Sequence, residues 1–377
     1  MNGFRAFLKD PLGPSHERVR TVVYVVLGVI LLSVTAQRSL FFHPTFPIFR
    51  LSFWNLLDGR NLYAGYDLGD RFKYSPTAAL LFGPFALPPF ALGLLLWNTL
   101  NVVALVYALD RLFSRSDATL ALVLLIPEIH GAMQRSQSNT LVAALIVLAF
   151  VCLERERQVS GYLAIALGAA IKLFPLAALS FAIFHHRRMR AAIVFAACAI
   201  FLLLLPLLVT PASTLLAQYR WWYEIESVDA FARGTSVMSL LHRALSVDWP
   251  NWPVQLAGLI VLLLPLVHVD RWKDPGFRVA FLASLLVFVV IFNHQAERPS
   301  FVIASTGVAI WFVTTSREPW RMALVLFSLT GLYAGGFVPV WAAMQLDLHR
   351  RETTRAALAG SAGSIFPAPQ VARKESA

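Results

Sequence analysis

Residues 118–133, 134–139 and 140–153 read ATLALVLLIPEIHGAM, QRSQSN and TLVAALIVLAFVCL. The first and third pieces are apolar and long enough to enter a bilayer as helices, whereas the middle piece is polar. Polar and charged groups at that depth usually pair with one another or line a wet cavity, because burying them in lipid is costly. We therefore expect two membrane helices joined by a functional polar turn.

The same alternation of apolar runs and short polar breaks continues along the chain. Only 14% of the 377 residues are charged, against about a quarter in a soluble protein, and 58% are hydrophobic. The sequence predicts an all-α, polytopic integral membrane protein with about 10–12 helices. These helices are expected at 19–36, 90–109, 118–132, 139–153, 160–184 (a candidate broken pair), 190–209, 254–270, 277–293, 299–314 and 321–340. The run 75–88 reads as a re-entrant segment or a thin crossing.

The distribution of basic residues predicts the orientation. The formal charge of +11 comes from arginines and lysines spread over loops, which favours anionic lipid headgroups over nucleic acid as partner. The run His185–Arg190 marks a cytoplasmic loop, and the N-terminus is expected on the same side of a bacterial cell membrane. Loops 37–74 and 210–253 then lie on the outer face and carry interfacial helices. Residues 1–344 are expected to form one membrane domain, and 345–377 a disordered tail on the outer side.

Two further polar fragments interrupt apolar sequence, at 72–76 and 293–298. The expected topology places all three polar fragments, including 134–139, on the outer face. In the first region Asp70 and Lys73 are three apart, so a helical turn would place both on one face. A carboxylate there can deprotonate a hydroxyl while a lysine holds a phosphate. The alternative is an interfacial helix whose charges reach for water.

The turn at 134–139 and the sequence around Lys172 offer polar ligands. Gln137 and Asn139 can hydrogen-bond sugar hydroxyls, although Ser138 or Asn139 can equally cap a helix. Lys172 precedes Leu173-Phe174-Pro175, and the proline is expected to break a helix there. Lys172 is a candidate phosphate ligand, with snorkelling to the membrane surface as the alternative.

The third fragment, Asn293–Arg298, combines a histidine with charged residues. His294 and Glu297 have the spacing of half a metal site but cannot complete one, so assistance by a divalent metal is left open. Glu297 is a candidate acid, base or substrate ligand, or else it pairs with Arg298 as a structural cluster. Tyr219, Trp221 and Trp222 in the second long loop are more typical of an interfacial aromatic belt than of sugar stacking.

Five short motifs, taken in order, resemble those of the polytopic glycosyltransferases of family 87. They are Gly59–Tyr63 with its G-x-x-x-Y form, Lys73-Tyr74-Ser75-Pro76, Leu96-Trp97, Gln137-Ser138-Asn139 and Gly168–Pro175 with its Lys-x-x-Pro end. The resemblance covers most of 19–320. It implies a membrane enzyme of the GT-C type that takes a mannose-like or arabinose-like sugar from a polyprenyl phosphate donor. The acceptor implied is a hydroxyl of a glycan or glycolipid.

The resemblance also implies roles for particular residues, with one departure from the family pattern. The family usually carries an acidic base early in the first outer loop, where this chain has Thr45. Asp70 and Glu297 are the candidate substitutes. Candidate ligands are Lys73 and Lys172 for the donor phosphate, and Tyr74, Gln137, Asn139, His294 and Arg298 for the rest of the substrate. A transporter or flippase of a polyprenyl-linked substrate, and a catalytically degenerate partner subunit, remain as alternatives.

Overall fold

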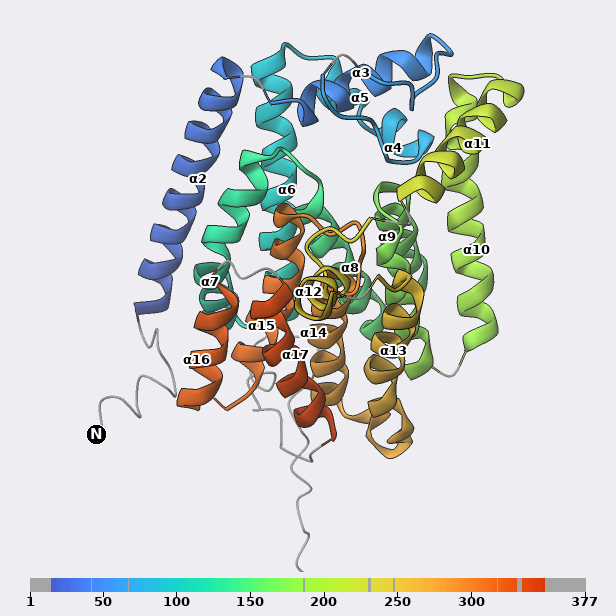
Figure 1. Ribbon diagram of the computed structural model, residues 1–377. Helices are drawn as coiled ribbons and strands as arrows, with labels where there is room; N and C mark the ends of the chain where they lie inside the picture. The colour runs from blue at the N-terminus through green and yellow to red at the C-terminus, as the bar shows by residue number, and fades with distance from the viewer. Residues whose placement is uncertain are drawn as a thin grey trace, which may run out of the picture.

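The computed structural model describes residues 15–349, except 42, 67, 186, 230–231, 247, 317 and 331–333. These described residues form helices joined by turns (Figure 1). The first part of the chain contains α2 (His16–Leu40), α3 (Thr45–Leu57), α4 (Pro76–Leu81), α5 (Gly83–Ala86), α6 (Phe90–Leu112), α7 (Arg115–Gln134), α8 (Asn139–Glu154) and α9 (Gln158–Ile171). The all-α prediction is confirmed.

The second part of the chain mixes α-helices with 3₁₀-helices. It contains η2 (Phe174–Phe184), α10 (Arg188–Leu204), η3 (Leu205–Leu208), α11 (Ala212–Asp229), α12 (Val237–Leu245), α13 (Asn251–Leu263), η4 (Leu264–Val267), η5 (Val269–Lys273), α14 (Pro275–Ile291), η6 (Arg298–Ser300), α15 (Phe301–Thr314), α16 (Pro319–Ser328) and α17 (Ala334–His349). Helices α2, α6, α7 and the α10–η3 pair are long and apolar enough to cross a membrane, and shorter apolar helices accompany them. The protein is therefore a multi-pass membrane protein.

Local sequence explains where several helices begin. Ser114 caps α7 by accepting a hydrogen bond from the Asp117 amide, and Asp274 caps α14 through the Gly276 amide. Pro175 occupies the first turn of η2, so the predicted run 160–184 is indeed a broken pair, α9 and η2, separated at Lys172.

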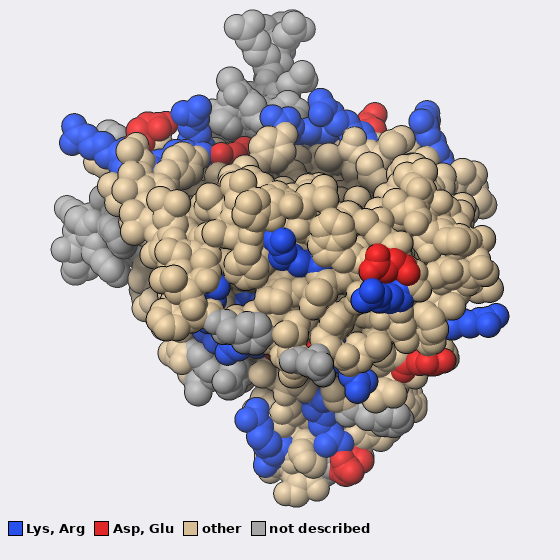
Figure 2. Space-filling model, turned by 90° about the horizontal axis from the view of Figure 1, so that it is seen from above, with Lys and Arg blue, Asp and Glu red and all other residues tan. Residues whose placement is uncertain are grey.

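One end of the bundle carries short helices in place of spanning ones. Helices α4 and α5 have 6 and 4 residues, too short to cross at about 1.5 Å per residue, so the run 75–88 is not a crossing. They lie with α3 and α11 at the end of the bundle opposite the start of α2 (Figure 1). Seen from that end, uncharged residues dominate the surface and the basic side chains are scattered (Figure 2).

Two expectations about the C-terminal part are corrected. The predicted helix 321–340 is two helices, because α16 ends at Ser328 and α17 begins at Ala334. The described chain consequently ends, at His349, on the side of the bundle where α2 begins (Figure 1), and not on the opposite side as the expected orientation required. Helix α17 also passes through the predicted start of the tail at 345, and 350–377 lie outside the described residues.

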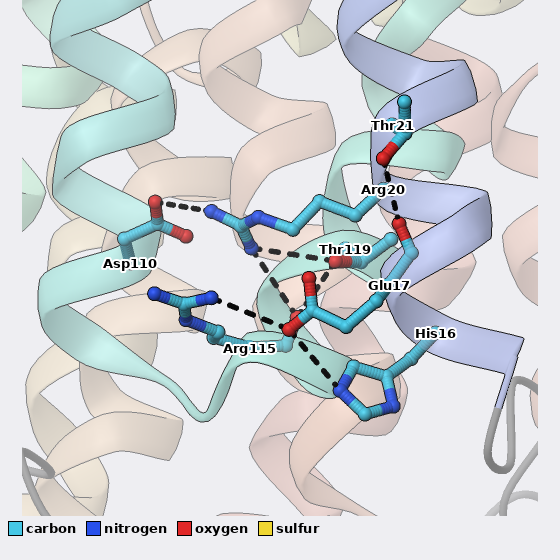
Figure 3. Close-up of polar contacts among 7 residues, drawn as sticks. All are labelled: His16, Glu17, Arg20, Thr21, Asp110, Arg115 and Thr119. Carbon is cyan, nitrogen blue, oxygen red and sulfur yellow. Dashed lines mark hydrogen bonds and ion pairs between the residues drawn. The ribbon is translucent and has the colours of Figure 1, made fainter.

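The bundle is held by close helix packing and by paired charges. An ideal Cβ on Gly307 of α15 would stand 2.4 Å from the Ala283 carbonyl oxygen of α14, so only glycine allows these helices to approach so closely. Near the start of α2, the buried Arg20 guanidinium donates to Asp110 of α6 and to Thr119 Oγ1 of α7 (Figure 3). Arg115 donates to Glu17 at 3.3 Å, which adds a second tie between α7 and α2.

Candidate active site

A cavity of 630 Å³ lies between the end of the bundle that carries α3 and α11 and the helices beneath it. The three polar fragments meet there, which confirms the prediction that they share one end of the molecule. Lining residues include Thr45, Asp70, Arg71, Lys73, Tyr74, Gln137, Lys172, Trp222, Glu226, Gln255, His294, Gln295 and Glu297. An apolar part is lined by Leu173, Phe174, Leu176, Leu256, Leu259, Phe288 and Phe292.

A chain of hydrogen bonds joins a lysine to a carboxylate across this cavity. Lys172 Nζ donates to Asn139 Oδ1 at 2.7 Å, and Asn139 Nδ2 donates to Gln137 Oε1 at 2.7 Å. Gln137 Nε2 then donates to Glu297 Oε2 at 2.9 Å. Lys172 lies in the break between α9 and η2, and there its side chain reaches Asn139. A continuous helix would move Lys172 away from Asn139. We call Lys172, Asn139, Gln137 and Glu297 the amide relay.

Ser138 and Tyr74 hold the relay against the first long loop. Ser138 is at the start of α8 but makes no capping hydrogen bond, and its Oγ donates to Tyr74 Oη at 3.1 Å. The capping explanation for the 138–139 pair is therefore wrong. Burial raises the pKa of the Tyr74 phenol above its ordinary value of 10.0, so the hydroxyl stays protonated at neutral pH. Tyr74 can thus donate a hydrogen bond but not act as a base.

Asp70 and Lys73 both border the cavity, but not as one face of a helix. Gly69 has a φ of +77°, and residues 70–75 are irregular, so the expected helical turn is absent. Both side chains are exposed. The backbone carbonyl of Lys73 accepts a 3.0 Å hydrogen bond from Trp222 Nε1, which ties this segment to α11.

Asp70 and Thr45 both line the cavity. The backbone amide of Thr45 donates to His43 Nδ1 at 3.5 Å, and the Asp70 charge is near enough to His43 to favour its protonated form. Burial and the charges of Arg38 and Arg135 outweigh that effect and lower the pKa of His43. Asp70 therefore shares this cavity with position 45, where the family resemblance expects an acid.

A second polar group surrounds His294 on another side of the cavity. Gln255 Nε2 lies 3.1 Å from His294 Nδ1, and Gln295 Nε2 donates to Glu226 Oε2 at 3.0 Å. Glu226, Gln255 and Gln295 were not among the predicted site residues. Trp222, expected in an interfacial belt, is half-buried and lines the cavity.

Arg298 is placed differently from the other predicted site residues. It does not line the cavity, and its Nη1 donates to both carboxylate oxygens of Glu128 in α7, at 3.0 and 2.9 Å. Its ionic partner is thus Glu128, and not the neighbouring Glu297 as the structural alternative supposed. Asn139 is fully buried, and its side chain is hydrogen-bonded to Gln137 and Lys172.

The cavity offers cations, carboxylates and amides around an apolar channel. Among the described residues no group of three or more His, Cys, Asp or Glu side chains is arranged to hold a metal ion. Lys73, Lys172 and Arg71 can neutralise a phosphate, while Asp70 and Glu297 can accept a proton. Such a site can hold an amphiphilic phosphate and activate a hydroxyl beside it.

The comparisons with known proteins agree with this chemistry. The sequence model for glycosyltransferase family 87 matches residues 72–293, more than half of the chain. No curated protein matches significantly. The matched span contains Lys73, Tyr74 and the first three members of the amide relay, whereas Asp70 and Glu297 fall just outside it. The chain belongs to glycosyltransferase family 87 and is a membrane glycosyltransferase that uses a lipid-linked sugar donor.

Proposed function

We propose that the protein transfers a mannose-like or arabinose-like sugar from polyprenyl phosphate to an acceptor hydroxyl at the outer face of the cell membrane. The observation that carries the proposal is the single cavity that combines two lysines, two candidate bases and an apolar channel. Each part matches one demand of the reaction: a phosphate to hold, a hydroxyl to deprotonate and a lipid chain to accommodate.

The donor is proposed to lie along the apolar channel with its phosphate at the lysines. Leu173, which directly precedes η2, and Leu176 of η2 line the channel together with Leu256 and Leu259 of α13 and Phe288 of α14. These four leucines are exposed, as a surface that contacts a lipid chain requires. Lys172 directly precedes Leu173 and lines the cavity together with Lys73, so both lysines are proposed to bind the phosphate.

Asp70 is proposed as the general base. It lines the cavity with Thr45 and lies near His43, so it can replace the acid that is missing at position 45. As the acceptor oxygen attacks the anomeric carbon, Asp70 takes the hydroxyl proton. The bond between that carbon and the phosphate oxygen breaks, and polyprenyl phosphate leaves with the electron pair. Lys73 and Lys172 stabilise the growing negative charge on the phosphate.

Glu297 is proposed to orient the substrate through the amide relay. One of its oxygens accepts a hydrogen bond from Gln137, and the relay continues to Lys172. The carboxylate therefore fixes the amides next to the proposed phosphate site and can accept a hydrogen bond from a sugar hydroxyl. Tyr74 and His294 complete the polar wall around the sugar.

The test is transfer of labelled sugar from a panel of polyprenyl phosphate donors by purified protein in lipid. Asp70→Asn should abolish transfer while donor binding persists, and Thr45→Asp added to Asp70→Asn should restore part of it. Glu297→Gln should mainly raise the KM for the donor. If Glu297→Gln abolishes transfer and Asp70→Asn does not, then Glu297 is the base. A parent protein that binds every donor but transfers from none would overturn the proposal and favour a transport or partner-subunit role.

A further inference from the structure

A second cavity, of 440 Å³, lies at the end of the bundle opposite the candidate active site, where α2 and α10 begin (Figure 1). Lys172, directly after α9, lines the first cavity, whereas Gln158, the first residue of α9, lines the second. The 14 residues of α9 span about 20 Å, so the two sites are separate. We call the second site the basic cavity, and its lining is Glu154, Glu156, Gln158, Phe184, His185, Arg187, Arg190 and Arg278.

One arginine of the basic cavity is neutralised by a carboxylate and two are not. Arg278 donates from Nε at 2.8 Å and from Nη2 at 2.7 Å to separate oxygens of Glu154, which makes this pair a neutral part of the wall. Arg187 and Arg190 are exposed, and their side chains form no ion pair within the part of the chain that the structure describes. Two guanidinium groups beside one cavity favour an anion, and their planar forks match the oxygens of a phosphate.

The starts of two helices add to this preference. Gln158 begins α9, and Arg187 directly precedes α10. Neither helix start has a side-chain cap. The first amides of a helix and the positive end of its dipole both favour a negative ligand. Two helix starts and two arginines therefore border the same cavity, and all of them favour an anion.

Two acceptor groups in the same lining show that a bare phosphate is not the best ligand. The carboxylate of Glu156 would repel a phosphate. Gln158 Oε1 is buried and accepts no hydrogen bond from the described residues, and a buried acceptor without a donor is costly. A ligand that carries hydroxyl groups beside its phosphate can donate to both side chains. The lining thus suits a phosphate group with hydroxyls attached nearby.

The apolar surface of α10 indicates that this phosphate belongs to a lipid. Helix α10, with η3, is apolar and long enough to cross a membrane. Met189 and Ile193 are 76% and 61% exposed, so they are available to contact acyl chains. Arg190 and Ile193 are three apart and share one face of α10. A headgroup held at Arg190 would therefore place its acyl chains along the exposed side of α10, as in other basic pockets between membrane helices.

We infer that the basic cavity binds the headgroup of an anionic phospholipid that carries hydroxyl groups, for which phosphatidylglycerol is the probe. The phosphate lies at Arg187 and Arg190, and the glycerol hydroxyls donate to Glu156 and Gln158. This inference does not depend on the proposed function, because the basic cavity shares no lining residue with the candidate active site.

The experiment titrates lipids into the full-length protein in detergent and measures the Kd of the first bound lipid by native mass spectrometry. Phosphatidylglycerol is compared with phosphatidylethanol, which has the same charge and acyl chains but no headgroup hydroxyl, and with zwitterionic phosphatidylcholine. Phosphatidylglycerol should bind about tenfold more tightly than phosphatidylethanol, as expected for a hydrogen bond to a charged group, and phosphatidylcholine should bind most weakly. The parent protein alone tests this order.

Three variants test the residues. Arg190→Gln should weaken both anionic lipids about tenfold, because it removes a charge that they share. Glu156→Ala should reduce the preference for phosphatidylglycerol over phosphatidylethanol. Arg18→Gln is the matched control, because Arg18 is an exposed arginine in the first turn of α2, at the same end of the bundle, and does not line the cavity. Its lipid affinities should equal those of the parent.

Three results would overturn the inference. Equal affinity for phosphatidylglycerol and phosphatidylethanol would show that the hydroxyls are not recognised. Equal losses in Arg18→Gln and Arg190→Gln would show a diffuse attraction of basic residues for lipid and not a site. Free glycerol 1-phosphate that binds as tightly as phosphatidylglycerol would show that the ligand is a soluble anion.

Discussion

The ion pair between Arg298 and Glu128 should stabilise the protein by an amount that its geometry allows one to work out. Breaking a buried pair typically costs about 3–5 kcal/mol, and breaking an exposed pair costs about 0–1 kcal/mol. The Glu128 side chain is 7% exposed and the Arg298 side chain 47%. Arg298→Ala should therefore lower the free energy of unfolding by an intermediate amount, about 2 kcal/mol.

A lysine at position 298 should recover much of that loss. A single nitrogen, Nη1 of Arg298, contacts both oxygens of Glu128, so one ammonium group can reproduce the contact. The pair between Arg278 and Glu154 is the matched contrast, because Arg278 uses Nε at 2.8 Å and Nη2 at 2.7 Å on separate oxygens. A lysine cannot supply that two-nitrogen contact, so Arg278→Lys should lose most of the stability of its pair.

The assay is reversible unfolding in mixed detergent micelles, with free energies compared among Arg298→Ala, Arg298→Lys, Arg278→Ala and Arg278→Lys. The reasoning is refuted if lysine rescues both positions equally, or if Arg298→Ala changes the unfolding free energy by less than about 0.5 kcal/mol, the range of ordinary surface substitutions. Arg298 follows Glu297 directly, so the pair should also position the amide relay. Glu128→Gln should then lower kcat/KM in the parent but have little further effect in Glu297→Gln.

Three other outcomes follow from the site. Lys172→Met should raise the donor KM about tenfold to a hundredfold in the transfer assay, because it removes the cation that Asn139 holds beside the proposed phosphate. The pKa of His43 is lowered in the folded protein, so the unfolded chain binds the proton first as pH falls through about 6.5. Stability should therefore drop on acidification. His43→Gln should reduce that drop in unfolding curves recorded at pH 7 and pH 5. Gly234→Ala should cost about 1–3 kcal/mol in the same unfolding assay, because φ is +47° and the new Cβ would lie 2.3 Å from the Ala296 oxygen, whereas Gly65→Ala, whose Cβ meets nothing within 4 Å, should be tolerated.

The helices and the meeting of the polar fragments could be predicted because each follows from local pattern. Apolar runs determine the spans, Pro175 breaks one of them, and alternating crossings return each polar turn to the same end of the bundle. The sequence does not predict the break between α16 and α17, since a largely apolar run conceals it and the hint is limited to the glycines at 331, 335 and 336.

Partners far apart in sequence could not be predicted. Arg298 forms an ion pair with Glu128, which lies 170 residues away in sequence, so no local spacing indicates the pair. Glu226 resembles the exposed Glu224 in sequence, and only the packing of α11 separates their environments. Asp70 and Lys73 have a helical spacing, but the segment between Gly69 and Pro76 is irregular and forms no helix.

The 3₁₀ winding of η2 has a consequence for which lipids the enzyme accepts. With three residues per turn, side chains three apart stand directly above one another, so Phe174 and Ala177, which both line the cavity, form a straight ridge along the helix axis. A straight ridge holds a chain by shared area and not by a matching shape. Such a wall does not select for chain length. The enzyme should therefore distinguish donors by their phosphate and sugar, and it should accept long and short prenyl tails equally.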